Sequence, residues 1–136
     1  SDMEQSYILQ IKPVFEDARG TIADLLEGKG LQHVGLIVSR KGAVRGNHYH
    51  KKATQYAYIL KGKVAYYRKD LRKESAPVES FILGPGALAV EPPNVVHAIV
   101  ALEDTEFLDM TDVSRDDKAY DSDTFRVEIT PAPGSR

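Results

Sequence analysis

The sequence predicts a single all-β domain, a jelly-roll (double-stranded β-helix) barrel of antiparallel strands. Three observations support this prediction. Apolar and β-branched runs of strand length recur along the chain, glycine- and proline-containing turns separate them about every eight to twelve residues, and no segment has the 3.6-residue apolar period of a capped helix. The length of 136 residues is that of one ordinary domain. We therefore expect one fold unit.

The expected domain covers residues 7–130. Residues 1–6 are predicted to be a flexible start, because Ser1 and Asp2 before Met3 are typical of a vector-derived remnant. Residues 131–136, which include two prolines and a glycine, are predicted to be a flexible tail.

In chain order, the first half is predicted to form strands at residues 7–12, 21–26, 33–39 and within 42–60. The turn Glu16–Gly20 joins the first two of these. The glycine turn at Gly62 predicts a hairpin between residues 56–60 and 64–68. Further strands are predicted at residues 78–83, 87–90, 95–102 and 105–113. Pro92 and Pro93 separate two of them, because proline cannot donate to a sheet ladder.

Composition limits the possible functions. The net charge is −2, with 42% hydrophobic and 28% charged residues, so binding to nucleic acid or to an anionic membrane through a basic patch is not expected. No apolar run reaches the roughly 20 residues of a membrane span, and the start does not have the pattern of an export signal, so a cytoplasmic location is expected. There is no cysteine. A metal site would therefore use histidine, carboxylate or amide ligands.

The strongest candidate site is the triplet His48-Tyr49-His50. In an extended strand, alternate side chains project to the same face, so the two imidazoles should lie together as a metal half-site or a proton-transfer site. His97 lies in a later strand and is the expected third member. The same alternation assigns Gln55 and Ala57 to one face and Tyr56 and Tyr58 to the other, where ordinary packing is expected.

Two spaced motifs give the chain a family resemblance. The first motif consists of Gly42, His48, His50, Gln55 and Gly62, and the second of Gly86, Pro92, Asn94 and His97. Their order and spacing resemble the two motifs of the cupin superfamily, which has an RmlC-like jelly-roll fold. Gln55 stands where the family usually has glutamate, and Asn94 where it usually has glycine. The resemblance implies a site at the mouth of the barrel.

A narrower resemblance covers more of the chain. The run Phe15–Gly20, the run Arg45–Lys52 and Gln55 are similar to the cupins of nucleotide-sugar and polysaccharide biosynthesis. The similar groups are the dTDP-sugar 3,4-ketoisomerases, the cupin domain of capsular polysaccharide reductases and, mainly in the early turn, the dTDP-4-keto-rhamnose 3,5-epimerases. The resemblance implies an isomerase or epimerase acting on a nucleotide-linked keto-deoxy sugar. Ketoisomerases also carry a tyrosine on the strand before the histidine pair, and residues 33–39 contain none.

Moving a sugar ketone requires removal of a proton alpha to the carbonyl and stabilisation of the enediolate that forms. Neutral imidazole suits the first step because its ordinary pKa lies near 6.5. His50 is the expected base and His48 its hydrogen-bonding partner. Arg45, Lys51 and Arg19 are candidates for binding phosphate oxygens, and Gln55 completes the expected substrate-binding set.

Two alternatives stay open. His48, His50 and His97, with Gln55, could hold zinc, iron or nickel in a metal-dependent enzyme of the dioxygenase type, although an amide binds a cation less strongly than a carboxylate. The third reading is a sugar-binding cupin module without catalysis. No organic cofactor is expected. A homodimer is expected, because a small barrel exposes strand edges that a second copy can cover.

Overall fold

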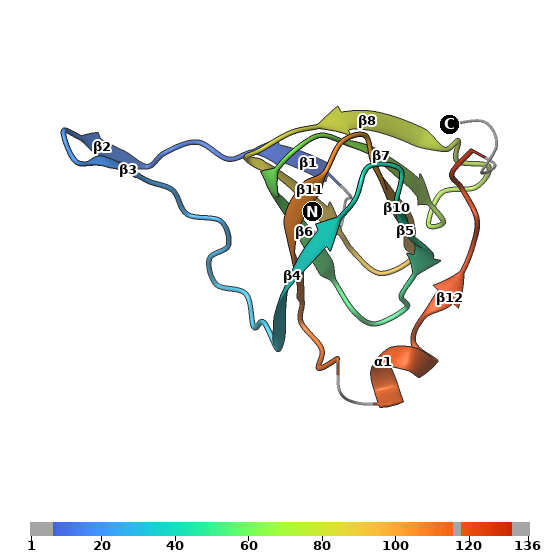
Figure 1. Ribbon diagram of the computed structural model, residues 1–136. Helices are drawn as coiled ribbons and strands as arrows, with labels where there is room; N and C mark the ends of the chain where they lie inside the picture. Colours follow the sequence, from blue (N-terminus) through green and yellow to red (C-terminus); the bar gives the residue numbers. More distant parts are fainter. Residues whose placement is uncertain (1–6, 116–117, 132–136) are drawn as a thin grey trace.

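The computed structural model describes residues 7–115 and 118–131, and two antiparallel five-stranded sheets pack face to face in it (Figure 1). In spatial order, the first sheet contains β1 (Tyr7–Gln10), β9 (Ala87–Glu91), β6 (Gln55–Lys61), β11 (Thr105–Thr111) and β4 (His33–Ser39). The second contains β12 (Phe125–Arg126), β5 (Val44–Tyr49), β10 (Val95–Ala101), β7 (Val64–Asp70) and β8 (Glu79–Leu83). The predicted jelly roll is confirmed.

Alternating side chains from both sheets fill the space between them. Ile59 and Phe107 from the first sheet meet Tyr66 and Ile99 from the second, and all four are almost completely buried. Period-two alternation puts every second residue of a strand into this core. The hydrophobic runs at β6, β10 and β11 were predicted as strands because of this pattern, and their observed bounds lie close to the predicted ones.

The outer face of the first sheet is also covered. Tyr56 and Tyr58 pack there with Met110, against Tyr7 and Leu31 from the first part of the chain. The prediction that these two tyrosines serve ordinary packing is therefore confirmed. The inner face of the same strand carries Gln55, Ala57 and Ile59 into the barrel.

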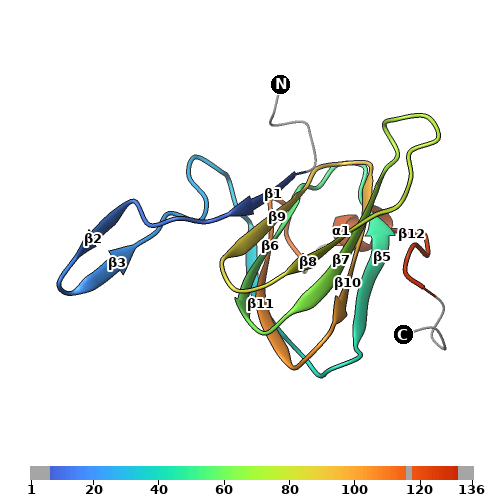
Figure 2. The same cartoon turned by 90° about the horizontal axis from the view of Figure 1, so that it is seen from above.

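A short hairpin extends away from the barrel (Figures 1 and 2). It consists of β2 (Phe15–Asp17) and β3 (Gly20–Ile22). Gly20, at the turn between them, has a φ of 132°, which a residue with a side chain rarely adopts. Val14, Phe15 and Ile22 are at least half exposed on it. The predicted turn is observed, but β1 pairs with β9 and not with the strand after the turn.

The C-terminal part of the chain contains two elements that the sequence did not predict. They are the helix α1 (Lys118–Ser122) and the strand β12, which pairs with β5. A five-residue helix is too short to show an apolar period, so tertiary contacts hold it in place. The predicted flexible start lies outside the described residues, as do residues 132–136 of the predicted tail. In the part of the chain that the structure describes, no helix has the length and apolar character needed to cross a membrane.

Candidate active site

His48, His50 and His97 meet in the barrel, at the end covered by α1. His48 lies directly opposite His97 in the β5–β10 pairing, and His50 follows β5 by one residue. The ring centroids are 4.7 Å apart for His48 and His97, 5.0 Å for His48 and His50, and 6.0 Å for His50 and His97. Gly46 allows this close approach, since a Cβ there would lie 2.7 Å from the carbonyl oxygen of His97. The structure thus brings together the three histidines that the sequence singled out.

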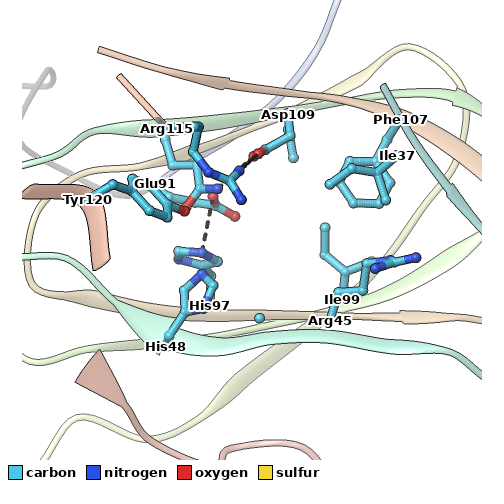
Figure 3. Close-up of a pocket in the computed structure, with 13 residues that line it drawn as sticks. Ile37, Arg45, His48, Glu91, His97, Ile99, Phe107, Asp109, Arg115 and Tyr120 are labelled. Carbon is cyan, nitrogen blue, oxygen red and sulfur yellow. Dashed lines mark hydrogen bonds and ion pairs between the residues drawn. The ribbon is translucent and has the colours of Figure 1, made fainter. Parts of the chain in front are cut away.

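His48 and His97 line a cavity of about 190 Å³ between the two sheets. Figure 3 shows that its two ends differ in chemistry. One end is polar and is formed by His48, Glu91, His97, Asp109, Arg115 and Tyr120. The other end is formed mainly by the apolar side chains of Ile37, Ala57, Ile99 and Phe107, with Arg45 beside Ile99. The cavity can therefore hold a small polar molecule that also carries an apolar group.

His48 is the imidazole with free nitrogens. Among the described residues, neither of its ring nitrogens has a hydrogen-bond partner, and the side chain is half-buried at the cavity wall. Burial, followed by the charges of His50, Arg126 and Arg115, lowers the pKa of His48 to about 4. The ring is therefore neutral at pH 7 and can accept a proton or a hydrogen bond.

His50 is held from both sides. Its Nδ1 lies 2.9 Å from the carbonyl oxygen of Asp123, so Nδ1 carries a proton and donates it to that bond. Its Nε2 lies 3.0 Å from Oε1 of Gln55, and Nε2 of Gln55 donates to Oδ1 of Asp109 at 2.6 Å. Arg115 donates to the other oxygen of Asp109 at 2.9 Å. A continuous buried network therefore joins His50 to Arg115.

A second buried group lies beside His97. Tyr66 donates its hydroxyl to Oε2 of Glu91 at 2.9 Å, and Oε1 of Glu91 lies 3.6 Å from Nε2 of His97. Burial raises the pKa of Glu91 well above its usual value and lowers that of His97 well below its own. Burial therefore favours the uncharged form of both groups, an un-ionised carboxyl and a neutral imidazole, at the polar end of the cavity.

Several residues of this site were missed by the sequence reasoning. Arg115 and Tyr120 come from the C-terminal segment, and the Arg115 guanidinium lies 4.4 Å from the centroid of the Tyr120 ring. No motif marks them. Asp109 and Glu91 could have been noticed, because each is a carboxylate at a core-facing position of a strongly apolar strand.

The predicted phosphate-binding residues are dispersed. Arg45 lines the cavity, but it donates to Ser39 at 2.8 Å and to the carbonyl oxygen of Val38 at 3.2 Å. Lys51 is exposed, and its ammonium lies 4.5 Å from the centroid of the Phe125 ring. Arg19 is in the projecting hairpin, paired with Asp17 at 2.7 Å. Within one chain, the structure therefore brings only Arg45 and Gln55 of this set to the cavity.

The three histidines also fit a metal ion. One ligand nitrogen from each lies within 4.8 Å of the others. Nε2 of His97 is buried and has no hydrogen-bond partner among the described residues, and His48 is also free. Two nitrogens on one tetrahedral zinc lie about 3.4 Å apart, given Zn–N bonds of about 2.1 Å. To join such a site, His50 would have to give up one of its present hydrogen bonds.

Comparison with known proteins identifies the family. The family model of the polysaccharide biosynthesis C-terminal domain matches residues 15–125, which include both histidine motifs and the segment carrying Arg115 and Tyr120. The chain belongs to this family. No curated protein matches the sequence of this polysaccharide biosynthesis C-terminal domain.

Solved structures with the same fold include enzymes of nucleotide-sugar metabolism. QdtA, a sugar 3,4-ketoisomerase from Thermoanaerobacterium thermosaccharolyticum in complex with TDP, is 20% identical with a TM-score of 0.68, covering 89% of this chain and 87% of its own. A 3,4-ketoisomerase from Helicobacter canadensis is 18% identical with a TM-score of 0.71, covering 89% and 90%. A dTDP-4-dehydrorhamnose 3,5-epimerase from Elizabethkingia anophelis is 20% identical with a TM-score of 0.71, covering 87% and 74%. The polysaccharide biosynthesis C-terminal domain therefore has the RmlC-like cupin fold.

Proposed function

We propose that this domain is an isomerase or epimerase that acts on a nucleotide-linked keto-deoxy sugar in cell-surface polysaccharide biosynthesis. The observation that carries the proposal is that His48 and the buried carboxyl of Glu91 line one small cavity, where burial lowers the pKa of the imidazole and raises that of the carboxyl. The family and the fold support the choice of substrate class.

The reaction needs a base and a hydrogen-bond donor on the same substrate. His48 is suited to take the proton alpha to the ketone, because its nitrogens have no other partner among the described residues. The carboxyl of Glu91, whose pKa burial raises, can donate to the oxygen on which negative charge develops. This assignment exchanges the two histidine roles expected from the sequence, because His50 is bonded at both nitrogens.

Charge near His48 supports a diphosphate-bearing substrate. In the backbone pairing of β12 with β5, Arg126 lies opposite His48. Arg115 lines the cavity. Both guanidiniums help to lower the pKa of His48. A bound diphosphate would offset them, which would raise the basicity of His48 when the substrate arrives. Arg115 and Arg126 are thus better candidates for the phosphate oxygens than Lys51 or Arg19.

The test is solvent deuterium incorporation. The full chain is incubated in D₂O with dTDP- and UDP-linked 4-keto-6-deoxy sugars, and proton NMR follows the positions next to the ketone. We expect exchange with at least one sugar, and a loss of about 100-fold or more in His48→Asn, because a general base contributes about 10²–10⁴-fold. His33→Asn is the control, since His33 does not line the cavity. Absence of exchange with every sugar, or full exchange in His48→Asn, would contradict the proposal.

A metal-dependent enzyme is the second candidate, and the orphaned Nε2 of His97 favours it. His48, His50 and His97 would hold zinc, iron or nickel, and the ion would act as a Lewis acid toward a substrate oxygen. Elemental analysis of protein purified without chelators or metal-affinity resin tests this candidate. One equivalent of metal per chain supports it, and a small fraction of an equivalent counts against it. Tight sugar binding without exchange or metal would instead support a binding module.

We also propose that the domain acts as a homodimer. On the free edge of the first sheet, β4 exposes Val34, Leu36 and Val38 by 58–59% each, and the projecting hairpin exposes Phe15 and Ile22. Apolar residues exposed in such a row at a strand edge are costly in water, and a second copy would cover them.

A further inference from the structure

Asp123 makes an unusual set of contacts for a residue outside both sequence motifs. Its carboxylate is 9% exposed and accepts hydrogen bonds from three consecutive backbone N–H groups, those of Lys51, Lys52 and Ala53, at 2.9–3.2 Å. These residues form the turn that directly follows His50. A carboxylate enclosed by successive backbone amides is strongly held.

The main chain of Asp123 binds the same region. Its carbonyl oxygen accepts the Nδ1–H of His50 at 2.9 Å, so it selects the tautomer in which Nδ1 is protonated. The hydroxyl of Thr124 lies 3.5 Å from the same nitrogen and donates to the carbonyl oxygen of Tyr120 at 2.8 Å. One residue thus fixes both the turn after His50 and the orientation of the ring.

The segment attached in this way forms part of the cavity wall. Tyr120 lines the cavity three residues before Asp123, with its ring centroid 5.1 Å from that of His50. In Figure 1, α1 lies below one end of the barrel, outside both sheets, and is followed by β12. Apart from the two-residue strand β12, the described sheets are complete without the C-terminal segment.

We propose that Asp123 is a positioning residue of the active site. Its carboxylate docks residues 118–124 on the turn after His50, and its carbonyl holds the His50 ring for catalysis. Without the carboxylate, the three N–H groups lose their acceptor and the segment detaches, taking Tyr120 and the Nδ1 acceptor away. The catalytic part of this proposal rests on the proposed function, whereas the docking and the tautomer do not.

The first test needs no substrate. In the ¹⁵N-labelled full chain, we expect a slowly exchanging Nδ1–H resonance from His50, identified by its loss in His50→Asn. Asp123→Ala should remove the resonance or speed its exchange at least about 10-fold, because a detached segment exposes the proton to water. Asp121→Ala is the matched control, because Asp121 is an exposed aspartate of α1 two residues before Asp123, and it should leave the resonance unchanged.

The second test is kinetic. At a temperature where each variant is folded, Asp123→Ala should lower kcat about 100-fold, since a small misplacement of a catalytic group can cost that much, with a smaller change in KM. Asp123→Asn keeps one acceptor oxygen and should recover part of this loss, and Asp121→Ala should match the wild type.

The outcomes separate the two proposals. If Asp123→Ala keeps the protected resonance, or loses thermal stability with an unchanged kcat, Asp123 is merely structural and the inference is overturned. If Asp123→Ala does not fold, Asp123→Asn decides by the same two criteria, with faster exchange and a reduced kcat expected. If the wild type acts on no nucleotide sugar, the proposed function fails, while the resonance still tests the docking and the tautomer.

Discussion

His97 and Glu91 face each other across the polar end of the cavity, with 3.6 Å between Nε2 and Oε1 and both side chains almost fully buried. If both groups were charged, folding would have to remove water from both charges. Burial instead raises the pKa of Glu91 and lowers that of His97, and each shift favours the neutral form. Burial thus favours the uncharged form of two titratable groups beside the cavity. Tyr66, at 0% exposure, supplies the hydrogen bond that Glu91 requires.

Removing that hydrogen bond should destabilise the protein. In Tyr66→Phe, Oε2 of Glu91 loses its donor in a buried place, so we expect the free energy of unfolding to fall by about 1–3 kcal/mol. Urea denaturation of the wild type and of Tyr66→Phe measures this difference in the free energy of unfolding. The control is Tyr67→Phe, whose half-buried ring lies on the next residue of the same strand, and a change below about 0.5 kcal/mol is expected there. Equal effects of the two substitutions would argue against a buried bond between Tyr66 and Glu91.

The lowered pKa of His48 predicts a pH-dependent stability. Below pH 6.5 the unfolded chain binds a proton at this residue, whereas the folded chain binds it only near pH 4. The folded state therefore loses stability as pH falls from 6.5 to 4. Relative to His48→Gln, which does not titrate, the wild type should lose about 2 kcal/mol across this range, allowing for the partial exposure of the ring.

Parallel denaturation curves of the two proteins at several pH values measure this difference. Titrating groups far from His48 are common to both proteins and cancel in the comparison, whereas His97, whose pKa the charge of His48 helps to lower, contributes to the difference. A constant difference from pH 6.5 to 4 would mean that His48 has an ordinary pKa in the folded protein. The lowered pKa of His48 would then be refuted.

Gln55→Glu should separate metal binding from proton transfer. The new carboxylate would face Asp109, which lies 2.6 Å from Nε2 of Gln55, so without metal we expect the free energy of unfolding to fall by about 2 kcal/mol. A carboxylate is also a better cation ligand than an amide, so added zinc should raise Tm more in this variant than in the wild type.

Thermal scans with and without zinc measure both effects of Gln55→Glu. Gln55→Ala is the control, because it removes the hydrogen bonds without adding a charge. If zinc shifts Tm equally in all three proteins, residue 55 does not contribute to a metal site at the three histidines.

The proposed dimer should depend on β4. Leu36→Lys places a charge in the middle of its exposed apolar row, so we expect a monomer in light scattering where the wild type is a dimer. Ile82→Lys is the matched control, because Ile82 is 64% exposed on β8 of the other sheet. A monomeric wild type, or a dimer that survives Leu36→Lys, would refute the role of this edge.

Local patterns in the sequence were sufficient for the fold. Period-two alternation, β-branched runs and glycine turns specify strands such as β4, β7 and β10 one at a time, because each of these signals acts between neighbours in the chain. The spacing of His48 and His50, and the later motif with His97, also identified the imidazoles that meet in the cavity.

The tertiary structure decided which of these groups are free to react. His48 and His50 look equivalent in the sequence, yet the carbonyl oxygen of Asp123 and the amide of Gln55 occupy both nitrogens of His50. Arg115, Tyr120 and Asp123 lie in a segment with no strand or helix period, and the contacts of Asp123 with His50, Lys51 and Ala53 place it over the barrel end. Such contacts join residues more than 50 positions apart, as between Lys51 and Asp123, so no local pattern encodes them.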